Sequence, residues 1–555
     1  MTTRPAFFTA FLGFAACLAA GCMGPVLRPQ SPDPPLSKAE DDASSAQLVS
    51  AVAHPFGLDY VKIENVALVT GLAGTGEDPV PSPQRAALLS ELNRREVPNP
   101  NELLASPNTA LVLVRGFLRP GIQEGDKLDL EIRVPSRSDA TSLRGGWLME
   151  TRLSEMANLG GSIRRGHETA LAEGPILVDP SAAKDNVALS TQGRVLGGGV
   201  ATKSRKLGLV LDHNHQSVRM SQLVAKAISD RFCTYVDGRR MGVATPQTDE
   251  YVDLVLHPRY KENVGRYMRV VRSVAVNEKL AARMERLRLL EDQIFDPVTA
   301  ETAALRLEAI GGDEAIEILT RAIAAEDAEV RFYAAEALAY LDVTEAVAPL
   351  AKAAVEDPSF RIAAIAALGA MEDGAASEAL AAMLSVKSAE TRYGAFRALS
   401  MMAQSDPRVR GQVLGGKFNY HILNVSGDAM IHATSSHRPE IVLFGKEHEL
   451  RLPLVLDAGP RILVNGMSGS QITVSRFSPN EPTQQRIVST KVDDVIRAVV
   501  DLGGHYPDVV QMLQQAKNDG ALPSRFRVNA LPEPGRPVDR EQRQAADPKL
   551  LTQAE

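Results

Sequence analysis

The chain has 555 residues, of which 44% are apolar and 23% are charged, and its formal net charge is −7. This length exceeds what one hydrophobic core normally supports and predicts several domains, while the apolar content is ample for buried cores. The acidic balance excludes a global basic field that would gather phosphates, so we expect no nucleic-acid partner.

The first residues have the pattern of an export signal. One early charge, Arg4, precedes an apolar stretch over residues 6–20, which is too short to span a bilayer and suits the apolar region of a signal peptide. The stretch ends in Leu-Ala-Ala-Gly before Cys22, and small residues before a cysteine are what lipoprotein signal peptidase needs. We therefore predict a signal peptide with a lipobox over residues 1–22 and lipidation at Cys22. A plain secretory signal cut nearby is the alternative.

A flexible linker and a mixed region follow. Residues 23–48 are rich in Pro, Ser and Asp and predict a tether. Over residues 49–290 strands and helices mix without regular alternation, which predicts an α+β region. Its expected strands cover residues 61–70, 109–114, 127–134, 251–256 and 268–276, and its expected helices cover 84–95 and 217–232.

Residues 291–410 contain an internal repeat. An Arg-x-x-Ala-x-x-Ala-Leu pattern recurs in phase at Arg331, Arg361 and Arg392, with the arginines 30 and 31 residues apart. Each unit offers two short helices rich in Ala and Leu, which predicts an all-α, HEAT-like solenoid. Two roles are open for these arginines. They could line a face that meets an acidic protein partner, or form salt bridges with Asp or Glu of the next unit.

Residues 411–530 return to a β pattern and close with two helices. Strands are expected over residues 445–456, 461–464 and 470–477. An apolar stripe from Val492 to Val500 predicts a helix that Gly503 ends at its C′ position. Pro507 suits the first turn of the next helix, which stops by Gly520. The last part, residues 531–555, has the composition of a disordered tail.

Three stretches outside the repeats carry a family resemblance. The first is a strand that starts at Asn65 and runs into a glycine-rich turn, and the third is the closing helix pair over residues 492–522. The second runs from residue 108 to a tight turn made of Ser142, Leu143, Arg144, Gly145 and Gly146. In their order and spacing these stretches resemble the flagellar P-ring protein family, whereas the repeats and the lipobox are not part of the usual family pattern.

The resemblance implies a structural, non-enzymatic subunit of a ring that surrounds the flagellar rod in the periplasm. Implied partners are copies of the chain itself, the rod, the outer-membrane ring protein and peptidoglycan. The turn from Ser142 to Gly146 is the candidate assembly contact. The repeats would form an added arm for an unknown protein partner, and Cys22 would hold the chain to a membrane. The alternative function is a lipid-anchored envelope adaptor whose repeats bind the partner.

Other chemistry is not indicated. The glycines from Gly71 to Gly76 have neither the spacing of a dinucleotide loop nor a following lysine, so we predict a structural turn. His213 and His215 lack a third ligand in the sequence, and the sequence shows no evident His or basic partner for Cys233. We therefore expect no catalytic residues, no cofactor and no metal. The predicted fold class is α+β multidomain, with ring-forming mixed parts and an inserted helical solenoid.

Overall fold

The computed structural model describes residues 46–532, apart from residues 160–161, 181–186, 237, 404 and 479–480. The predicted signal peptide, its Cys22 and the tail from residue 533 onward lie outside this part. Among the helices of the described residues, none has the length and apolar character needed to cross a membrane.

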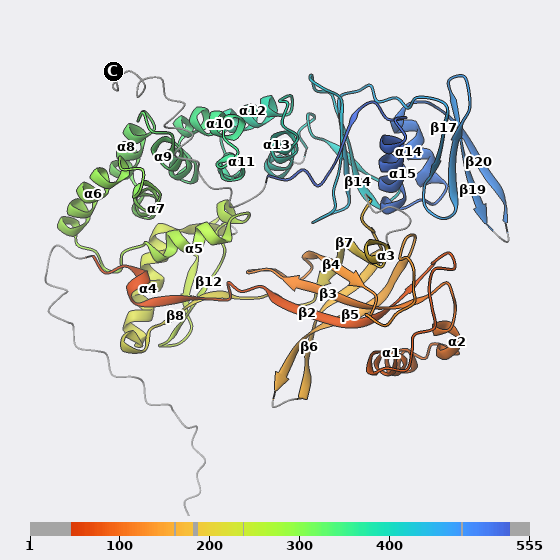
Figure 1. Cartoon of the computed structure of the whole chain (residues 1–555). Helices are drawn as coiled ribbons and strands as arrows, with labels where there is room; N and C mark the ends of the chain where they lie inside the picture. Colours follow the sequence, from red (N-terminus) through yellow and green to blue (C-terminus); the bar gives the residue numbers. More distant parts are fainter. Residues whose placement is uncertain are drawn as a thin grey trace, which may run out of the picture.

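Six antiparallel strands close into a barrel in the order β2-β3-β4-β7-β6-β5 (Figure 1). In β4, every second side chain (Leu128, Leu130 and Ile132) is buried, because alternation sends them into the barrel core. Helices α1, α2 and α3 accompany the barrel, and α1 and α2 pack on its outside. The bounds are β2 Val61–Thr70, α1 Pro83–Arg94, α2 Pro100–Leu104, β3 Ala110–Leu118, β4 Lys127–Arg133, β5 Trp147–Leu159, β6 Ser162–Pro175, α3 Val187–Ser190 and β7 Gln192–Ala201.

A small domain lies next to the barrel and contains a four-stranded sheet in the order β1-β8-β12-β11. The predicted helix over residues 217–232 is present as α4, with the Ser217 side chain as its N-cap. The strand predicted over residues 268–276 is wrong, because these residues belong largely to a helix, α5. The bounds are β1 Ala53–Phe56, β8 Leu207–Leu211, α4 Val218–Arg231, β9 Cys233–Val236, β10 Arg239–Gly242, β11 Ala244–Pro246, β12 Tyr251–Leu254 and α5 Val264–Arg272.

Eight helices, α6 to α13, follow and stack into a solenoid. The repeat arginines stand at or near the start of every second helix, α9, α11 and α13. One continuous core joins the small domain, the solenoid and one face of the next sheet. The bounds are α6 Leu280–Ile294, α7 Ala300–Ile310, α8 Asp313–Ala322, α9 Ala328–Tyr340, α10 Val347–Glu356, α11 Arg361–Ala370, α12 Gly374–Met383 and α13 Ala389–Met402.

The C-terminal domain has two sheets with a helix pair between them. The sheets have the orders β13-β14-β16-β15-β21 and β17-β18-β19-β20, and α14 and α15 share a core with both. The expected C′ glycine, Gly503, has a positive φ of 100°. The bounds are β13 Gly411–Leu414, β14 Phe418–Leu423, β15 Met430–Ala433, β16 Glu440–Phe444, β17 Leu454–Asp457, β18 Ile462–Gly466, β19 Gln471–Ser478, β20 Glu481–Ser489, α14 Val492–Asp501, α15 Tyr506–Asn518 and β21 Arg525–Val528.

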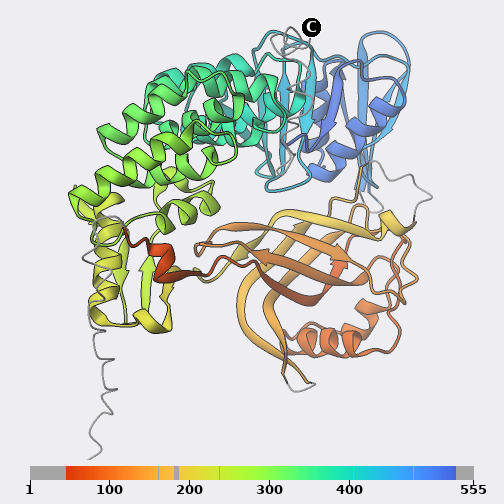
Figure 2. The same cartoon turned by 60° about the vertical axis from the view of Figure 1, so that its left-hand side comes forward.

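The parts are arranged around a closed path. Figures 1 and 2 show the solenoid rising from the small domain and reaching the C-terminal domain, which sits over the barrel. The two parts of the chain that flank the repeats therefore meet in space.

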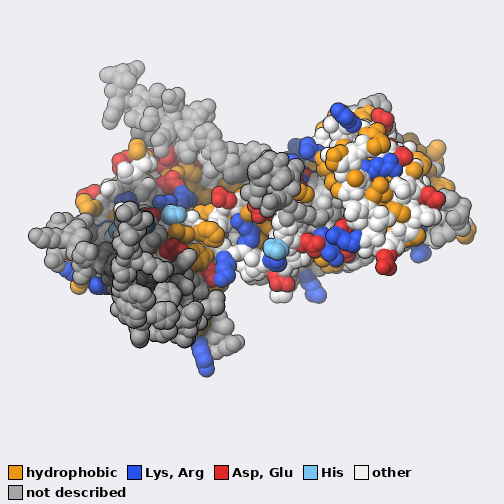
Figure 3. Space-filling view, turned by 90° about the horizontal axis from the view of Figure 1, so that it is seen from below, with side chains coloured by type: hydrophobic (Ala, Val, Ile, Leu, Met, Phe, Trp, Pro, Cys, Tyr) orange, Lys and Arg blue, Asp and Glu red, His pale blue; other side chains and the backbone are white. Residues whose placement is uncertain are grey.

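On the face seen from below in Figure 3, Lys and Arg side chains are interspersed with Asp and Glu rather than gathered in one field.

Candidate assembly interface

The turn from Ser142 to Gly146 is fixed to the barrel by its backbone. The carbonyl oxygen of Ser142 accepts a hydrogen bond from the Thr75 hydroxyl at 2.7 Å, and the N–H of Leu143 donates to the Ser190 carbonyl at 2.8 Å. The Leu143 side chain is fully buried in the barrel core. Gly145 has a φ of +74°, a conformation that residues with a side chain rarely adopt. The turn is thus a rigid projection from the barrel.

This projection meets the C-terminal domain of the same chain. A Cβ atom on Gly145 would lie 2.7 Å from Cγ of Pro460, so the backbone approaches that ring closely. A cavity of only about 10 Å³ remains between the turn and α15, and its lining includes Arg144, Pro507 and Asp508. Burial lowers the pKa of Arg144, and the charge of Asp179 opposes this effect. The candidate assembly turn therefore lies in an intramolecular contact, and a role between subunits stays a prediction.

Substituting Gly145 should loosen this contact. We expect Gly145→Ala to cost about 1–2 kcal/mol for the left-handed backbone and about 1–3 kcal/mol more for overpacking against Pro460. Trp147, the single tryptophan, lies beside His505 across the same contact with 5.3 Å between ring centroids. Its emission should shift to longer wavelength as the contact opens.

Gly125→Ala is the matched control, because Gly125 has a φ of +86° but no atom lies within 4 Å of the position that a Cβ would take there. It should carry the backbone cost alone and leave the emission of Trp147 unchanged. Equal urea midpoints and equal emission spectra for the two variants would show that the close approach to Pro460 adds nothing to the stability cost of Gly145→Ala.

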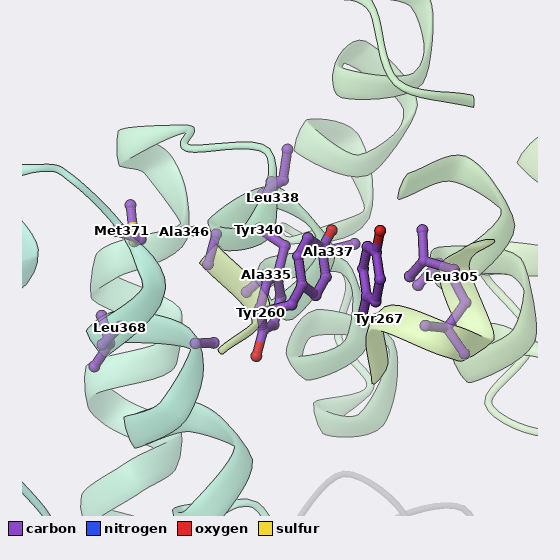
Figure 4. Close-up of a cluster of buried hydrophobic side chains, with 14 of the residues drawn as sticks. Tyr260, Tyr267, Leu305, Ala335, Ala337, Leu338, Tyr340, Ala346, Leu368 and Met371 are labelled. Carbon is purple, nitrogen blue, oxygen red and sulfur yellow. The ribbon is translucent and has the colours of Figure 1, made fainter. Parts of the chain in front are cut away.

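A buried ion cluster joins the small domain to the solenoid. Arg266 of α5 donates from Nη2 to Glu308 of α7 at 2.5 Å, and its Nη1 lies 2.6 Å from Oε2 of Glu336 on α9. The hydroxyl of Tyr260 donates to Glu308 at 2.6 Å, and its ring stacks on Tyr340 (Figure 4). Burial alone would lower the pKa of Arg266, but the charges of Glu308 and Glu336 outweigh burial and raise it. The cluster thus holds a charged guanidinium in a site that is 2% exposed.

A second buried cluster joins the other end of the solenoid to the C-terminal domain. The hydroxyl of Tyr393 on α13 donates to Oε1 of Glu440 on β16 at 2.8 Å. The Tyr393 ring stacks on His432 of β15, with 3.6 Å between the ring centroids. Beside it, Nη1 of Arg392 donates to the carbonyl of Asp428 at 2.7 Å. Because both ends of the solenoid are tied by buried polar contacts, the repeats form a bridge within the chain and not a free arm.

The three repeat arginines donate hydrogen bonds to backbone carbonyls at or just after the C-terminal ends of the preceding helices. Arg361 and Arg392 are buried, at 8% and 0% exposure, so the expectation that they line a partner-binding face is wrong for these two. Their guanidinium groups satisfy carbonyls that a helix end leaves without a partner. The distances from the guanidinium nitrogen to the carbonyl oxygen are 2.8 Å for Arg331 and Ala325, 3.1 Å for Arg361 and Ala354, and 2.9 Å for Arg392 and Leu384. The predicted salt bridge to the next unit is confirmed for Arg361, which pairs with Glu390 at 3.0 Å.

Two protein families match separate parts of the chain, one over the barrel and the small domain and the other within the solenoid. Residues 51–285 match the family model of the flagellar P-ring protein. This stretch contains the barrel and the small domain. Residues 321–400 match the family model of HEAT repeats. The predicted resemblance is therefore confirmed for this stretch, and the P-ring match ends within α6, the first helix of the solenoid.

Several curated relatives carry the same name. The flagellar P-ring protein of Nitratidesulfovibrio vulgaris is 25% identical over 248 residues, which cover 44% of this chain and 64% of the relative. That of a Bradyrhizobium species is 25% identical over 257 residues, covering 45% and 65%. That of Hydrogenovibrio crunogenus is 32% identical over 175 residues, covering 30% and 44%. The chain thus spans under two thirds of these relatives, and none of their names denotes an enzyme.

The P-ring match does not extend to the closing helix pair, so the resemblance of residues 492–522 stays a prediction. The remaining sequence candidates fall into structural roles. Gly76 allows a close approach to the Thr109 carbonyl, which fits a structural turn. His213 and His215 lie in a 3-10 helix, and no cluster of metal-ligating side chains occurs among the described residues.

The buried cluster at Arg266 was missed by the sequence reasoning, although a signal for it exists. Glu308 and Glu336 occupy the same position of two successive repeats, each followed by Ala and then Ile or Leu. The later units have Ala366 and Arg397 at this position. A carboxylate that occurs only in the first units of a solenoid indicates a neighbour that ends there, and here that neighbour is α5.

Proposed function

We propose that this chain is a structural subunit of a flagellar P-ring, assembled from identical copies around the rod in the periplasm. The observation that carries the proposal is the match of the barrel and small domain, residues 51–285, to the P-ring family model. The rod, the outer-membrane ring protein and peptidoglycan are the expected neighbours, and Cys22 is the proposed lipid anchor.

The repeats extend this subunit. The two parts that flank them are in contact through the turn at Gly145 and Pro460, so the solenoid closes a path instead of separating them. In a ring, a solenoid tied at both ends would hold a fixed orientation relative to the barrel of its own subunit. We therefore propose that the solenoid widens each subunit and offers its outer surface to another envelope component.

Electron microscopy of basal bodies tests the proposal. Cells would carry the chain with a tag at its C-terminus, and basal bodies from cells with the untagged chain would be the control. We expect label on a ring around the rod, with extra density that corresponds to the solenoid. Intact rings without label in motile cells would contradict the proposal and favour a lipid-anchored adaptor.

A further inference from the structure

The inner face of the solenoid forms a groove. It has a volume of about 1010 Å³ and is lined by α11, α13, the turn at Pro258 and the strand end at Asn529. Its apolar side chains include Ile362 and Met401, and Met401 is 43% exposed. Charged residues of both signs stand along it, among them Lys261, Glu262, Glu372, Asp373 and Arg397. A groove of this character suits an extended segment with mixed charges and scattered apolar side chains.

The chain itself enters this groove after its last strand, β21. The N–H of Ala530 donates to Nε2 of His432 at 2.9 Å, which fixes the direction of the chain. Leu531 then packs on the core of the solenoid. The Cγ atom of Pro532 lies 3.2 Å from where a Cβ on Gly394 would stand, so Pro532 rests against α13. The described chain thus ends inside the groove, seated on the helices that line it.

We infer that residues 533–555 continue along this groove and cover it, so that the tail of the chain is the resident ligand of its own repeats. The segment has what the groove requires. It carries Arg536, Asp539, Arg540 and Glu541 for the mixed charges, and its apolar side chains are Val538, Leu550 and Leu551. Pro534 and Pro537 favour an extended backbone, which needs no internal hydrogen bonds and can lie along a surface.

The attachment at Pro532 makes this occupant the strongest competitor for the site. A short flexible tether gives a local concentration on the order of 1 mM. A tail that binds with a Kd of about 0.1 mM would then fill the groove in roughly nine molecules of ten. A protein partner of this face would have to displace the tail, which makes the repeats a regulated surface.

Photocrosslinking in the full chain tests the inference. A benzophenone amino acid at Met401 should crosslink to a peptide from residues 533–555, independently of protein concentration. The control position is Val355 on α10, which is 42% exposed and not among the groove-lining residues. It should give at least tenfold less of that product. Equal yields at the two positions, or crosslinks only between copies at high concentration, would overturn the inference.

A second measurement covers a variant that crosslinks poorly. The chain that ends at Pro532 should bind a synthetic peptide of residues 533–555 with a Kd below about 0.2 mM, and Met401→Glu should weaken this binding at least fivefold. The full chain should bind the peptide at least fivefold more weakly than the shortened chain, because its groove is filled. No binding to the shortened chain at 1 mM peptide would overturn the inference.

Discussion

Arg266→Met is expected to destabilise the chain by about 3–5 kcal/mol, because it leaves two buried carboxylates without their cation. Glu308 and Glu336 are 0% and 6% exposed, so water cannot replace the guanidinium. The substitution also removes the cation from the face of Tyr340, whose ring centroid lies 4.6 Å from Cζ. Urea unfolding followed by far-UV circular dichroism measures the loss.

The matched control is Arg269→Met on the same helix. Arg269 also pairs with a carboxylate of α7, Glu301, at 2.6 Å, but the two side chains are about half exposed. An exposed pair contributes about 0–1 kcal/mol, so this variant should stay close to the parent. Equal losses for the two variants would contradict the importance of burial at Arg266.

A compensating variant separates charge from packing. In Arg266→Met with Glu308→Leu and Glu336→Leu, the charges are removed together. A buried ion cluster replaced by apolar side chains of similar volume is often as stable as the original. We therefore expect most of the lost stability to return, and a further loss would mean that the site depends on hydrogen bonds that the leucines cannot make.

The elements that follow one clear periodicity could be predicted from the sequence. The strand at residues 127–134 and the closing helix pair are present as expected, because alternation and helical stripes each report one buried face. The segment at residues 268–276 has apolar positions that suit both periods. Its many β-branched residues favoured a strand, but Asn263 caps a helix by accepting from the Arg266 N–H at 3.0 Å. Packing on α7 decided between the two.

The expected strand over residues 445–456 shows a different limit. Alternating leucines predicted one long strand, but the ladder contains only β17, which begins after Pro453. Proline has no N–H to donate to a neighbouring strand. The edge strand β20 escaped prediction because its side chains are largely exposed and polar, so no buried face marks it in the sequence.

The contacts between domains could not be predicted from the sequence for a related reason. The approach of Gly145 to Pro460 joins residues more than three hundred positions apart, and nothing in the local sequence at either end indicates the other. The repeated arginines could be recognised in the sequence, but the surroundings of their side chains could not be predicted. An arginine in phase suits both an exposed face and a buried helix end, and only the burial of Arg361 and Arg392 separates these roles.

Acid should destabilise the C-terminal domain through His432. Burial and the charge of Arg397 lower the pKa of His432 to about 3. Below an unfolded pKa of about 6.5 the unfolded chain binds a proton that the folded chain refuses, so the free energy of unfolding falls as the pH falls. Well below the unfolded pKa each pH unit is worth about 1.4 kcal/mol, and integration gives a loss of about 2 kcal/mol between pH 6.5 and 4.5.

His432→Gln is expected to flatten this dependence. Glutamine can still accept from the Ala530 N–H but does not titrate, so the urea midpoint should fall less between pH 7 and 4.5 even if its value at pH 7 is lower. His213→Gln, at an exposed position, should keep the steep slope of the parent. Equal slopes for all three chains would exclude His432 as the source.

A smaller slope should remain in His432→Gln for a specific reason. Burial also lowers the pKa of His421 and His448, which act in the same direction. Asp508 opposes them, because burial raises its pKa to about 6 and its protonation adds stability as the pH falls from about 6 toward 4. These groups are common to all three chains and cancel in the comparison. The difference between the slopes therefore isolates His432, whose ring ties the solenoid to the C-terminal domain through Tyr393.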